Sequence, residues 1–221
     1  MPMHRFFDPM MFVPEVTYTL IVVVLCLIIY LKTREIYDLT KHRGIYYFRN
    51  TFLFFGLAYV FRFFFYLFHL TQMALQLDIP RRVIGPASLV LTGYLSTMAI
   101  LYLVYSSLWK RLGDKKFLIL SNLAAAIISV IALMTKSPYI ITIAQAVLLA
   151  AALITGYFLY KKSKKFYELL VLYLLLSIFW ITSLLNLGQR VFMPFELRLG
   201  MQLISIVVFI IIYLKVAKWA K

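Results

Sequence analysis

The stretch LIVVVLCLIIYLKTR, residues 20–34, decides the fold, because an unbroken apolar run ends abruptly in the basic residues Lys32 and Arg34. A helix that crosses the hydrocarbon core of a bilayer needs about 20 mainly apolar residues, and basic residues gather at the cytoplasmic ends of such helices. The basic flank follows the apolar run instead of preceding it. We therefore expect a retained membrane helix and not a cleaved signal peptide.

The same pattern repeats along all 221 residues. Only 14% of them are charged, against about 25% in an average soluble domain. In lipid, apolar runs of this length can satisfy their backbone only as helices, and the ten-residue alternation of a transmembrane barrel is absent. The sequence predicts an all-α polytopic integral membrane protein, a single domain of seven transmembrane helices. The predicted spans are residues 12–31, 46–67, 86–109, 117–134, 139–160, 166–187 and 195–214.

Basic residues on alternate connections predict the topology. Sixteen of the 23 Lys and Arg residues lie after the first, third, fifth and seventh spans, six lie on the opposite side, and Arg62 lies within a span. By the positive-inside rule, we expect a plasma-membrane protein with its N-terminus outside and its C-terminus in the cytoplasm. Each helix that enters from outside should carry a proline in its first turn, where the ring costs no hydrogen bond. These prolines are Pro14, Pro86, Pro138 and Pro194.

The first connection gives two local expectations. Residues 32–38 should continue the first helix beyond the membrane, with Arg34 and Asp38 paired at a spacing of four residues. Gly44 should then allow the turn into the second helix.

Small residues spaced four apart in the fourth and fifth spans predict close helix contacts. Packing within the chain is the preferred interpretation, and a homo-oligomer surface is the alternative. The pairs are Ala125–Ser129, Ala146–Ala150 and Ala152–Gly156.

The net charge of +15 does not indicate nucleic acid. The charges lie at helix ends, where topology requires them, and no connection is long enough for a nucleic-acid-binding module. The basic inner face is instead expected to attract the head groups of anionic lipids.

Arg62 is the most unusual residue, because a charge within a span is costly and is a functional-site candidate by default. It lies about 8 Å below the outer end of its span, so snorkelling of the guanidinium to the outer head groups is an equal alternative. Tyr59, Tyr66 and His69 share its helical face. Glu15, at the outer rim, is a possible ionic partner.

Other spans place polar or aromatic groups at a similar depth. If these faces converge with that of Arg62, they form an outward-opening ligand pocket; hydrogen bonding between helices is the alternative. The further candidates for this pocket are Thr92, Gln145, Trp180, Asn186 and Gln202.

Signals for catalysis are poor. The sequence has no His-Glu-x-x-His motif, no paired acidic motif within a span and no Gly-rich phosphate loop. Its three histidines are widely separated, which makes a zinc site improbable, and no lysine lies mid-span in the last helix to hold retinal. We therefore expect no enzyme, no catalytic residue, no metal and no cofactor.

One region carries a resemblance: KTREIYDLTKHRGIYYFRN, residues 32–50, followed by FLFFGLAYVFRF, residues 52–63. It resembles uncharacterised archaeal seven-helix membrane proteins and, more loosely, the seven-helix sensory region that precedes the kinase in some membrane histidine kinases. With the topology and Arg62, this favours a sensor or receptor-like protein that binds a small or lipophilic ligand from outside and signals through a partner protein. The alternatives are a small transporter or channel subunit, or a structural subunit of a membrane complex.

Overall fold

The computed structural model describes residues 9–75, 81–109, 114–135, 137, 139–162, 167–188 and 194–219. Within these ranges the chain forms helices and no strand, which confirms the all-α prediction. The helices are α1 (Pro9–Thr40), α2 (Arg43–Leu75), α3 (Arg81–Leu108), α4 (Asp114–Thr135), α5 (Tyr139–Lys162), α6 (Tyr167–Gly188) and α7 (Phe195–Trp219).

Six of these helices, α1 to α5 and α7, are long and apolar enough to cross a membrane. In α6 the apolar stretch found among the described residues is shorter, Leu170–Ser183. Large apolar side chains also cover the outside of the bundle, among them Ile119, Ile143 and Leu203. A soluble protein rarely exposes such continuous apolar surface, whereas lipid solvates it. The chain therefore has the composition and surface of a membrane protein.

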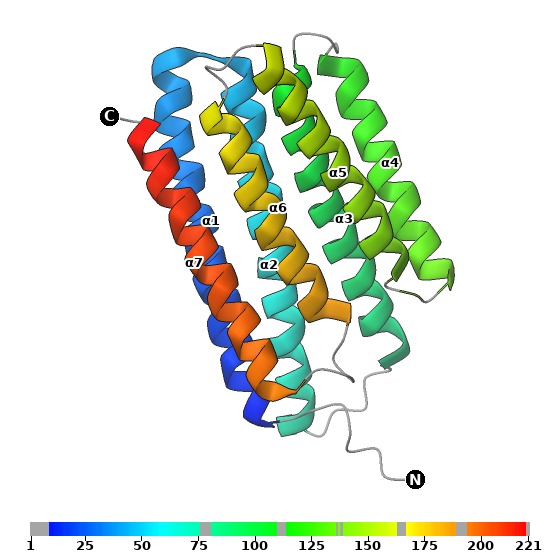
Figure 1. Cartoon of the computed structure of the whole chain (residues 1–221). Coiled ribbons are helices and arrows are strands. Elements are labelled where there is room, and N and C mark those ends of the chain that lie inside the picture. The colour runs from blue at the N-terminus through cyan, green and yellow to red at the C-terminus, as the bar shows by residue number, and fades with distance from the viewer. Residues whose placement is uncertain are drawn as a thin grey trace.

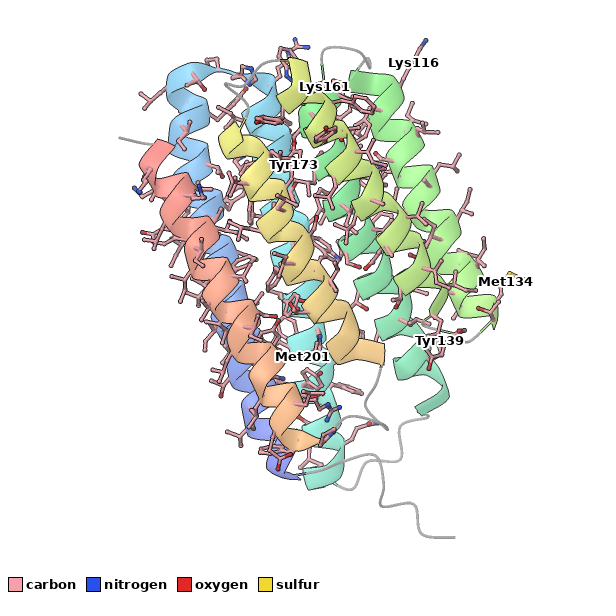
Figure 2. All side chains as sticks on the ribbon, in the orientation of Figure 1. Lys116, Met134, Tyr139, Lys161, Tyr173 and Met201 are labelled. Atoms are coloured by element: carbon pink, nitrogen blue, oxygen red, sulfur yellow. The ribbon has the colours of Figure 1, made fainter. Side chains whose placement is uncertain are left out.

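The helices run alternately in opposite directions, so α1 begins at one end of the bundle and α7 finishes at the other (Figure 1). In the order α1, α2, α3, α5, α6 and α7, each helix packs against the next, and α7 packs back against α1. These six helices form a closed ring. α4 lies outside the ring, against α3 and α5. The end with the α1–α2 connection also carries Lys116 and Lys161, and Met134 and Tyr139 lie toward the other end (Figure 2).

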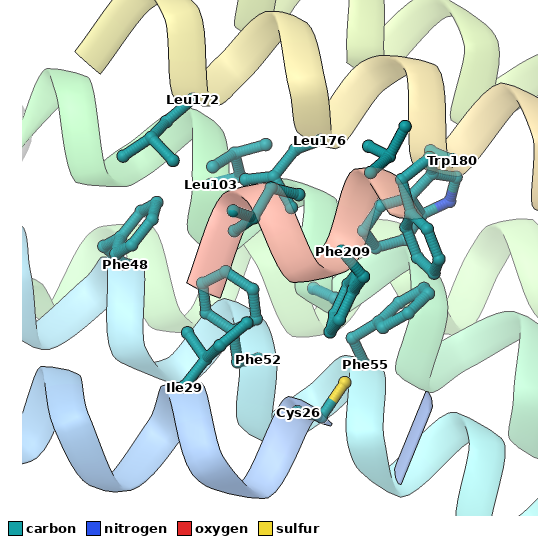
Figure 3. Packing of buried hydrophobic residues seen from close by; sticks show 14 of the residues in the cluster. Cys26, Ile29, Phe48, Phe52, Phe55, Leu103, Leu172, Leu176, Trp180 and Phe209 are labelled. Atoms are coloured by element: carbon teal, nitrogen blue, oxygen red, sulfur yellow. The ribbon is translucent and has the colours of Figure 1, made fainter. Parts of the chain in front are cut away.

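Aromatic side chains fill the middle of the ring (Figure 3). The ring of Phe55 on α2 lies 4.4 Å from that of Trp180 and 5.1 Å from that of Phe179, both on α6, measured between centroids. Phe209 of α7 lies 4.5 Å from Phe179 and 6.1 Å from Phe52 of α2. Among the described residues the backbone of α2 does not approach that of α6 or α7. These rings therefore span the space between the helices and form the centre of the larger of two buried apolar clusters.

Two prolines lie deeper in their helices than predicted. α1 begins at Pro9 and α3 at Arg81, in each case five residues before the proline, so Pro14 and Pro86 are internal to helices. The expectation that they occupy first turns is wrong, because each helix extends beyond its apolar span into the polar flank. Pro194 directly precedes α7, as predicted, and Pro138 lies outside the described residues.

The first helix continues beyond its apolar span as predicted. It runs to Thr40, and the Nε of Arg34 lies 3.9 Å from Oδ2 of Asp38 one turn later. Both side chains are exposed, so this ion pair contributes little to stability.

The turn into α2 does not use glycine. Lys41 adopts the left-handed backbone conformation, with φ of 49°, and its N–H donates to the carbonyl of Tyr37 over 2.7 Å. The prediction for Gly44 is wrong, because that residue already lies in the first turn of α2. A Cβ there would lie 3.1 Å from the backbone oxygen of Ser106, so the glycine serves the close approach of α2 to α3.

Small residues elsewhere allow close helix contacts. A Cβ on Gly56 would lie 3.1 Å from Cβ of Cys26, and one on Gly156 would lie 2.7 Å from Cδ2 of Tyr173. The pairs Ala125–Ser129 and Ala152–Gly156 are buried, which confirms packing within the chain. The pair Ala146–Ala150 faces outward on α5 and does not take part in that packing.

Gly156→Ala should destabilise the protein by about 1–3 kcal/mol, the usual cost of overpacking a close contact. The buried Tyr173 ring cannot yield easily, because its hydroxyl lies 2.6 Å from both Ser106 Oγ and Ser107 Oγ. Thermal unfolding in detergent measures the effect. Gly85→Ala is the matched control, since a Cβ there meets nothing within 4 Å; equal melting temperatures for the two variants would contradict this account.

Candidate functional site

Arg62 is held by tyrosines of its own helix. Its Nε donates to the hydroxyl of Tyr66 over 3.0 Å, and its Cζ lies 5.6 Å from the ring centroid of Tyr66 and 5.7 Å from that of Tyr59. Tyr66 and Tyr59 lie at positions i+4 and i−3 relative to Arg62, so the three side chains share one face of α2, as expected from helical spacing. A cation at this distance from an aromatic face is stabilised by about 0.5–2 kcal/mol. Arg62 is half-buried, so the guanidinium is positioned without being fully enclosed.

Tyr59 connects this arginine to two other helices. Its hydroxyl donates to Ser183 Oγ of α6 over 3.1 Å. The hydroxyl of Tyr18 on α1 lies 3.4 Å from that of Tyr59 and 3.5 Å from Ser183 Oγ. All three side chains are buried. Tyr18, Tyr59 and Ser183, here called the hydroxyl cluster, thus join α1, α2 and α6 directly beside Arg62.

An acidic residue of α1 also stabilises the guanidinium of Arg62. The carboxylate of Glu15 on α1 attracts the Arg62 guanidinium electrostatically. Removing a guanidinium from water is costly, and a nearby anion and a hydroxyl acceptor offset part of that cost.

Gln145 organises a second polar cluster at the contact of α3, α5 and α6. Its Nε2 donates to Ser96 Oγ over 2.6 Å and to Thr97 Oγ1 over 3.4 Å. Its Oε1 accepts from Nε1 of Trp180 over 3.3 Å. Gln145 is buried with both ends of its amide bonded, which is the arrangement of an interhelical contact in an apolar environment.

Phe55 separates the two clusters. Its ring centroid lies 4.9 Å from that of Tyr59 and 4.4 Å from that of Trp180. Trp180 and Ser183 are one turn apart on α6, so this helix contributes to both clusters. The structure thus brings Arg62 together with its tyrosines, and Gln145 together with Trp180, as two neighbouring polar groups joined by an aromatic contact.

The other candidates are placed as follows. The Thr92 hydroxyl donates to the carbonyl of Ser88 within α3, one turn from Ser96. Gln202 is buried on α7, and no hydrogen bond among the described side chains joins it to Arg62 or Gln145. The side chains of His69 and Asn186 lie outside the described residues, although their backbones belong to α2 and α6.

Several buried hydroxyls were not recognised from the sequence. Thr182 Oγ1 lies 2.6 Å from Ser205 Oγ and joins α6 to α7, and Tyr173 joins α6 to two serines of α3. No sequence pattern distinguishes such hydroxyls from those that bond their own helix. Among the described residues no group of three or more His, Cys, Asp or Glu side chains could hold a metal ion.

Comparison with known proteins identifies an archaeal relative. A protein of Archaeoglobus fulgidus, described only as an uncharacterized protein, is 32% identical over 210 residues, which cover 92% of this chain and 91% of the relative. This chain belongs to the family of that archaeal protein. The archaeal resemblance seen in the sequence is therefore confirmed, whereas no comparison supports the link to kinase sensory regions. No family model and no solved structure matches the chain.

Gln145→Leu and Trp180→Phe should be coupled in a double-mutant cycle by about 0.5–1.5 kcal/mol, the range for hydrogen bonds between membrane helices. Unfolding of the wild type, both single variants and the double variant in detergent measures the coupling. Ser106→Ala combined with Trp180→Phe is the control and should be additive, because Ser106 contacts Tyr173 and not Trp180. If the changes in the free energy of unfolding of Gln145→Leu and Trp180→Phe were additive, the hydrogen bond between the two side chains would make no net contribution to stability.

Proposed function

We propose that this protein is a receptor-like plasma-membrane protein that binds a small lipophilic ligand through Arg62. In this proposal seven helices cross the bilayer, with the N-terminus outside and the C-terminus in the cytoplasm. Arg62 then lies near the outer face. The observation that carries the proposal is the half-buried guanidinium held on two tyrosine rings within an apolar helix.

The chemistry of Arg62 favours a ligand with an anionic or carbonyl group. A guanidinium has five N–H donors in one plane, and Nε uses one of them on Tyr66. The tyrosine rings stabilise the positive charge at 5.6 and 5.7 Å, and the remaining N–H donors of the guanidinium suit a carboxylate or phosphate. The surrounding apolar helices favour a lipophilic body on such a ligand.

The hydroxyl cluster offers a route for signalling. A ligand that draws the guanidinium away from Tyr59 changes the surroundings of a side chain that also contacts α1 and α6. Helices that pack in two alternative arrangements can convert such a local change into a shift of populations. A separate partner protein would read that shift at the cytoplasmic connections.

The charge distribution supports the proposed orientation. Lys116 and Lys161 lie at the end of the bundle that carries the α1–α2 connection (Figure 2). Lys32, Arg34 and Lys41 belong to that connection or to the part of α1 that leads into it. Basic residues near helix ends favour the cytoplasmic side.

Decanoate, a carboxylate with an apolar tail, should bind the purified protein, and Arg62→Ala should weaken that binding about tenfold or more, as expected for a lost charge-assisted hydrogen bond. Tyr66→Phe should weaken it less, because the ring remains. Calorimetric titration in detergent measures the affinities, with decanol as the uncharged control ligand and Lys161→Ala as the control variant. Equal binding of decanoate to the wild type and Arg62→Ala would place the site elsewhere.

A receptor should move no solute. Proteoliposomes that carry the protein should therefore leak protons and potassium no faster than empty vesicles, as followed with a pH-sensitive dye and a potassium electrode. The packed rings of Phe55, Trp180 and Phe209 on the axis of the bundle support this expectation. Protein-dependent flux would favour the small transporter or channel subunit instead.

A further inference from the structure

A second arginine of α2 is also surrounded by tyrosines. The Cζ of Arg49 lies 5.0 Å from the ring centroid of Tyr46, 5.2 Å from that of Tyr30 and 5.3 Å from that of Tyr37. Tyr46 comes from α2, and the other two come from α1. Three rings around one guanidinium form a cage built from two helices. Arg49 is half-buried and lies six residues into α2, near the α1–α2 connection.

The two arginines of α2 share a local sequence. Tyr-Tyr-Phe-Arg at residues 46–49 is followed by Tyr-Val-Phe-Arg at residues 59–62, so each arginine has a tyrosine three positions earlier on the same helical face. The thirteen-residue interval separates them by about 20 Å along the helix axis. Arg62 has a hydrogen-bond acceptor in Tyr66. The Nε of Arg49 is enclosed, and no acceptor for it exists among the described residues.

Lys41 brings a second positive charge to the cage. Its Nζ lies 5.6 Å from the ring centroid of Tyr37, so Lys41 and Arg49 both contact this one ring. Lys41 reaches this position from a left-handed backbone conformation, which is costly for a residue with a Cβ. A glycine would close the helix without that cost. The shared ring therefore places two cations, Lys41 and Arg49, at one site.

None of the acidic residues of this region pairs with Arg49 in the described structure. Glu35 Oε2 lies 2.8 Å from Lys32 Nζ. Asp38 lies 3.9 Å from Arg34 and 3.5 Å from Lys41 itself, so this lysine of the cage keeps one exposed acidic neighbour. Arg49 makes no ion pair of this kind within the described part of the chain. The three rings stabilise the positive charge of the guanidinium, and none of their hydroxyls is a hydrogen-bond partner of its enclosed Nε. An acceptor with several oxygens is what this arrangement lacks.

We propose that Arg49 and Lys41 bind a phosphate group at the α1–α2 end of the bundle, with Tyr30, Tyr37 and Tyr46 as the walls of the site. A phosphate matches a planar guanidinium and a separate ammonium at once, because it offers oxygens in several directions. Since Nε is enclosed, the phosphate approaches the terminal nitrogens of Arg49 and Nζ of Lys41. Its source is either a phospholipid head group or free phosphate. The site does not depend on which way the protein faces, because both membrane surfaces carry lipid phosphates.

The test measures binding to the purified full-length protein in detergent by native mass spectrometry, with three probes in separate arms. These are a short-chain phosphatidylglycerol, the matching diacylglycerol without phosphate, and inorganic phosphate. We expect phosphatidylglycerol to bind the wild type, and Arg49→Gln to reduce the bound fraction about tenfold. Arg49→Lys should bind at an intermediate level, because it keeps the charge and loses the planar donors.

Two controls separate a site from general attraction or misfolding. Lys161→Ala removes an exposed cation at the same end of the bundle and should bind phosphatidylglycerol like the wild type. Tyr37→Phe keeps the aromatic ring and should fold and bind phosphatidylglycerol normally. Tyr37→Leu removes the ring and should weaken binding. Its melting temperature should not fall below that of Arg49→Lys, which would show that the weaker binding is not caused by misfolding.

The outcomes distinguish the source of the phosphate. Arg49-dependent binding of phosphatidylglycerol alone assigns a lipid head group, and Arg49-dependent binding of inorganic phosphate assigns free phosphate. Equal binding of diacylglycerol and phosphatidylglycerol would overturn the proposal. So would equal losses in Arg49→Gln and Lys161→Ala, because they would show only a diffuse attraction to positive charge. Binding of decanoate at Arg62 is measured separately, so failure of either proposal leaves the other intact.

Discussion

The structure depends on the aromatic side chains of α2, which fill the space that a ring of six helices would otherwise enclose. Within the described residues, the backbone of α2 packs against α1 and α3 and does not approach that of α6 or α7. Phe52 and Phe55 nevertheless contact the rings of Phe179, Trp180 and Phe209 across that space. Large flat side chains can bridge helices at such separations, and a core made of smaller residues would leave a cavity.

Polar contacts then fix how the helices are oriented around this core. A buried hydroxyl or amide in an apolar bundle is stabilised by a partner on a neighbouring helix or on its own backbone. Gln145 joins three helices, and the hydroxyl cluster joins another three. α6 contributes Trp180 to the Gln145 cluster and Ser183 to the hydroxyl cluster, so a shift of α6 would disturb both clusters. The position of α6 is therefore coupled to both polar clusters.

The two arginines of α2 show how one helix can carry two different environments. Both lie close to tyrosine rings, which stabilise a cation in an apolar setting. Arg62 donates a hydrogen bond to Tyr66 and is attracted electrostatically by Glu15, whereas Arg49 shares Tyr37 with a second cation. The first arrangement is balanced within the protein, and the second favours an anion from outside it. The same local sequence therefore supports two distinct proposals, one at each end of the helix.

Much of the architecture could be predicted, since apolar runs of membrane length must be helical whatever their neighbours are. The group of Arg62 with Tyr59 and Tyr66 also follows from spacing along one helix. The turn at Lys41 and the internal positions of Pro14 and Pro86 were missed, because helix ends depend on polar flanks whose pattern is weak.

The sequence by itself determined the helical class, the apolar surface and the charge asymmetry, because these depend on composition and on spacing along the chain. Only the tertiary structure decided that Gln145 meets Trp180, that Tyr18 and Ser183 meet Tyr59, and that Tyr30 and Tyr37 surround Arg49. Each of these contacts joins different helices. Their rotation and order in the ring are set by the packing of all the side chains together, which no local pattern records.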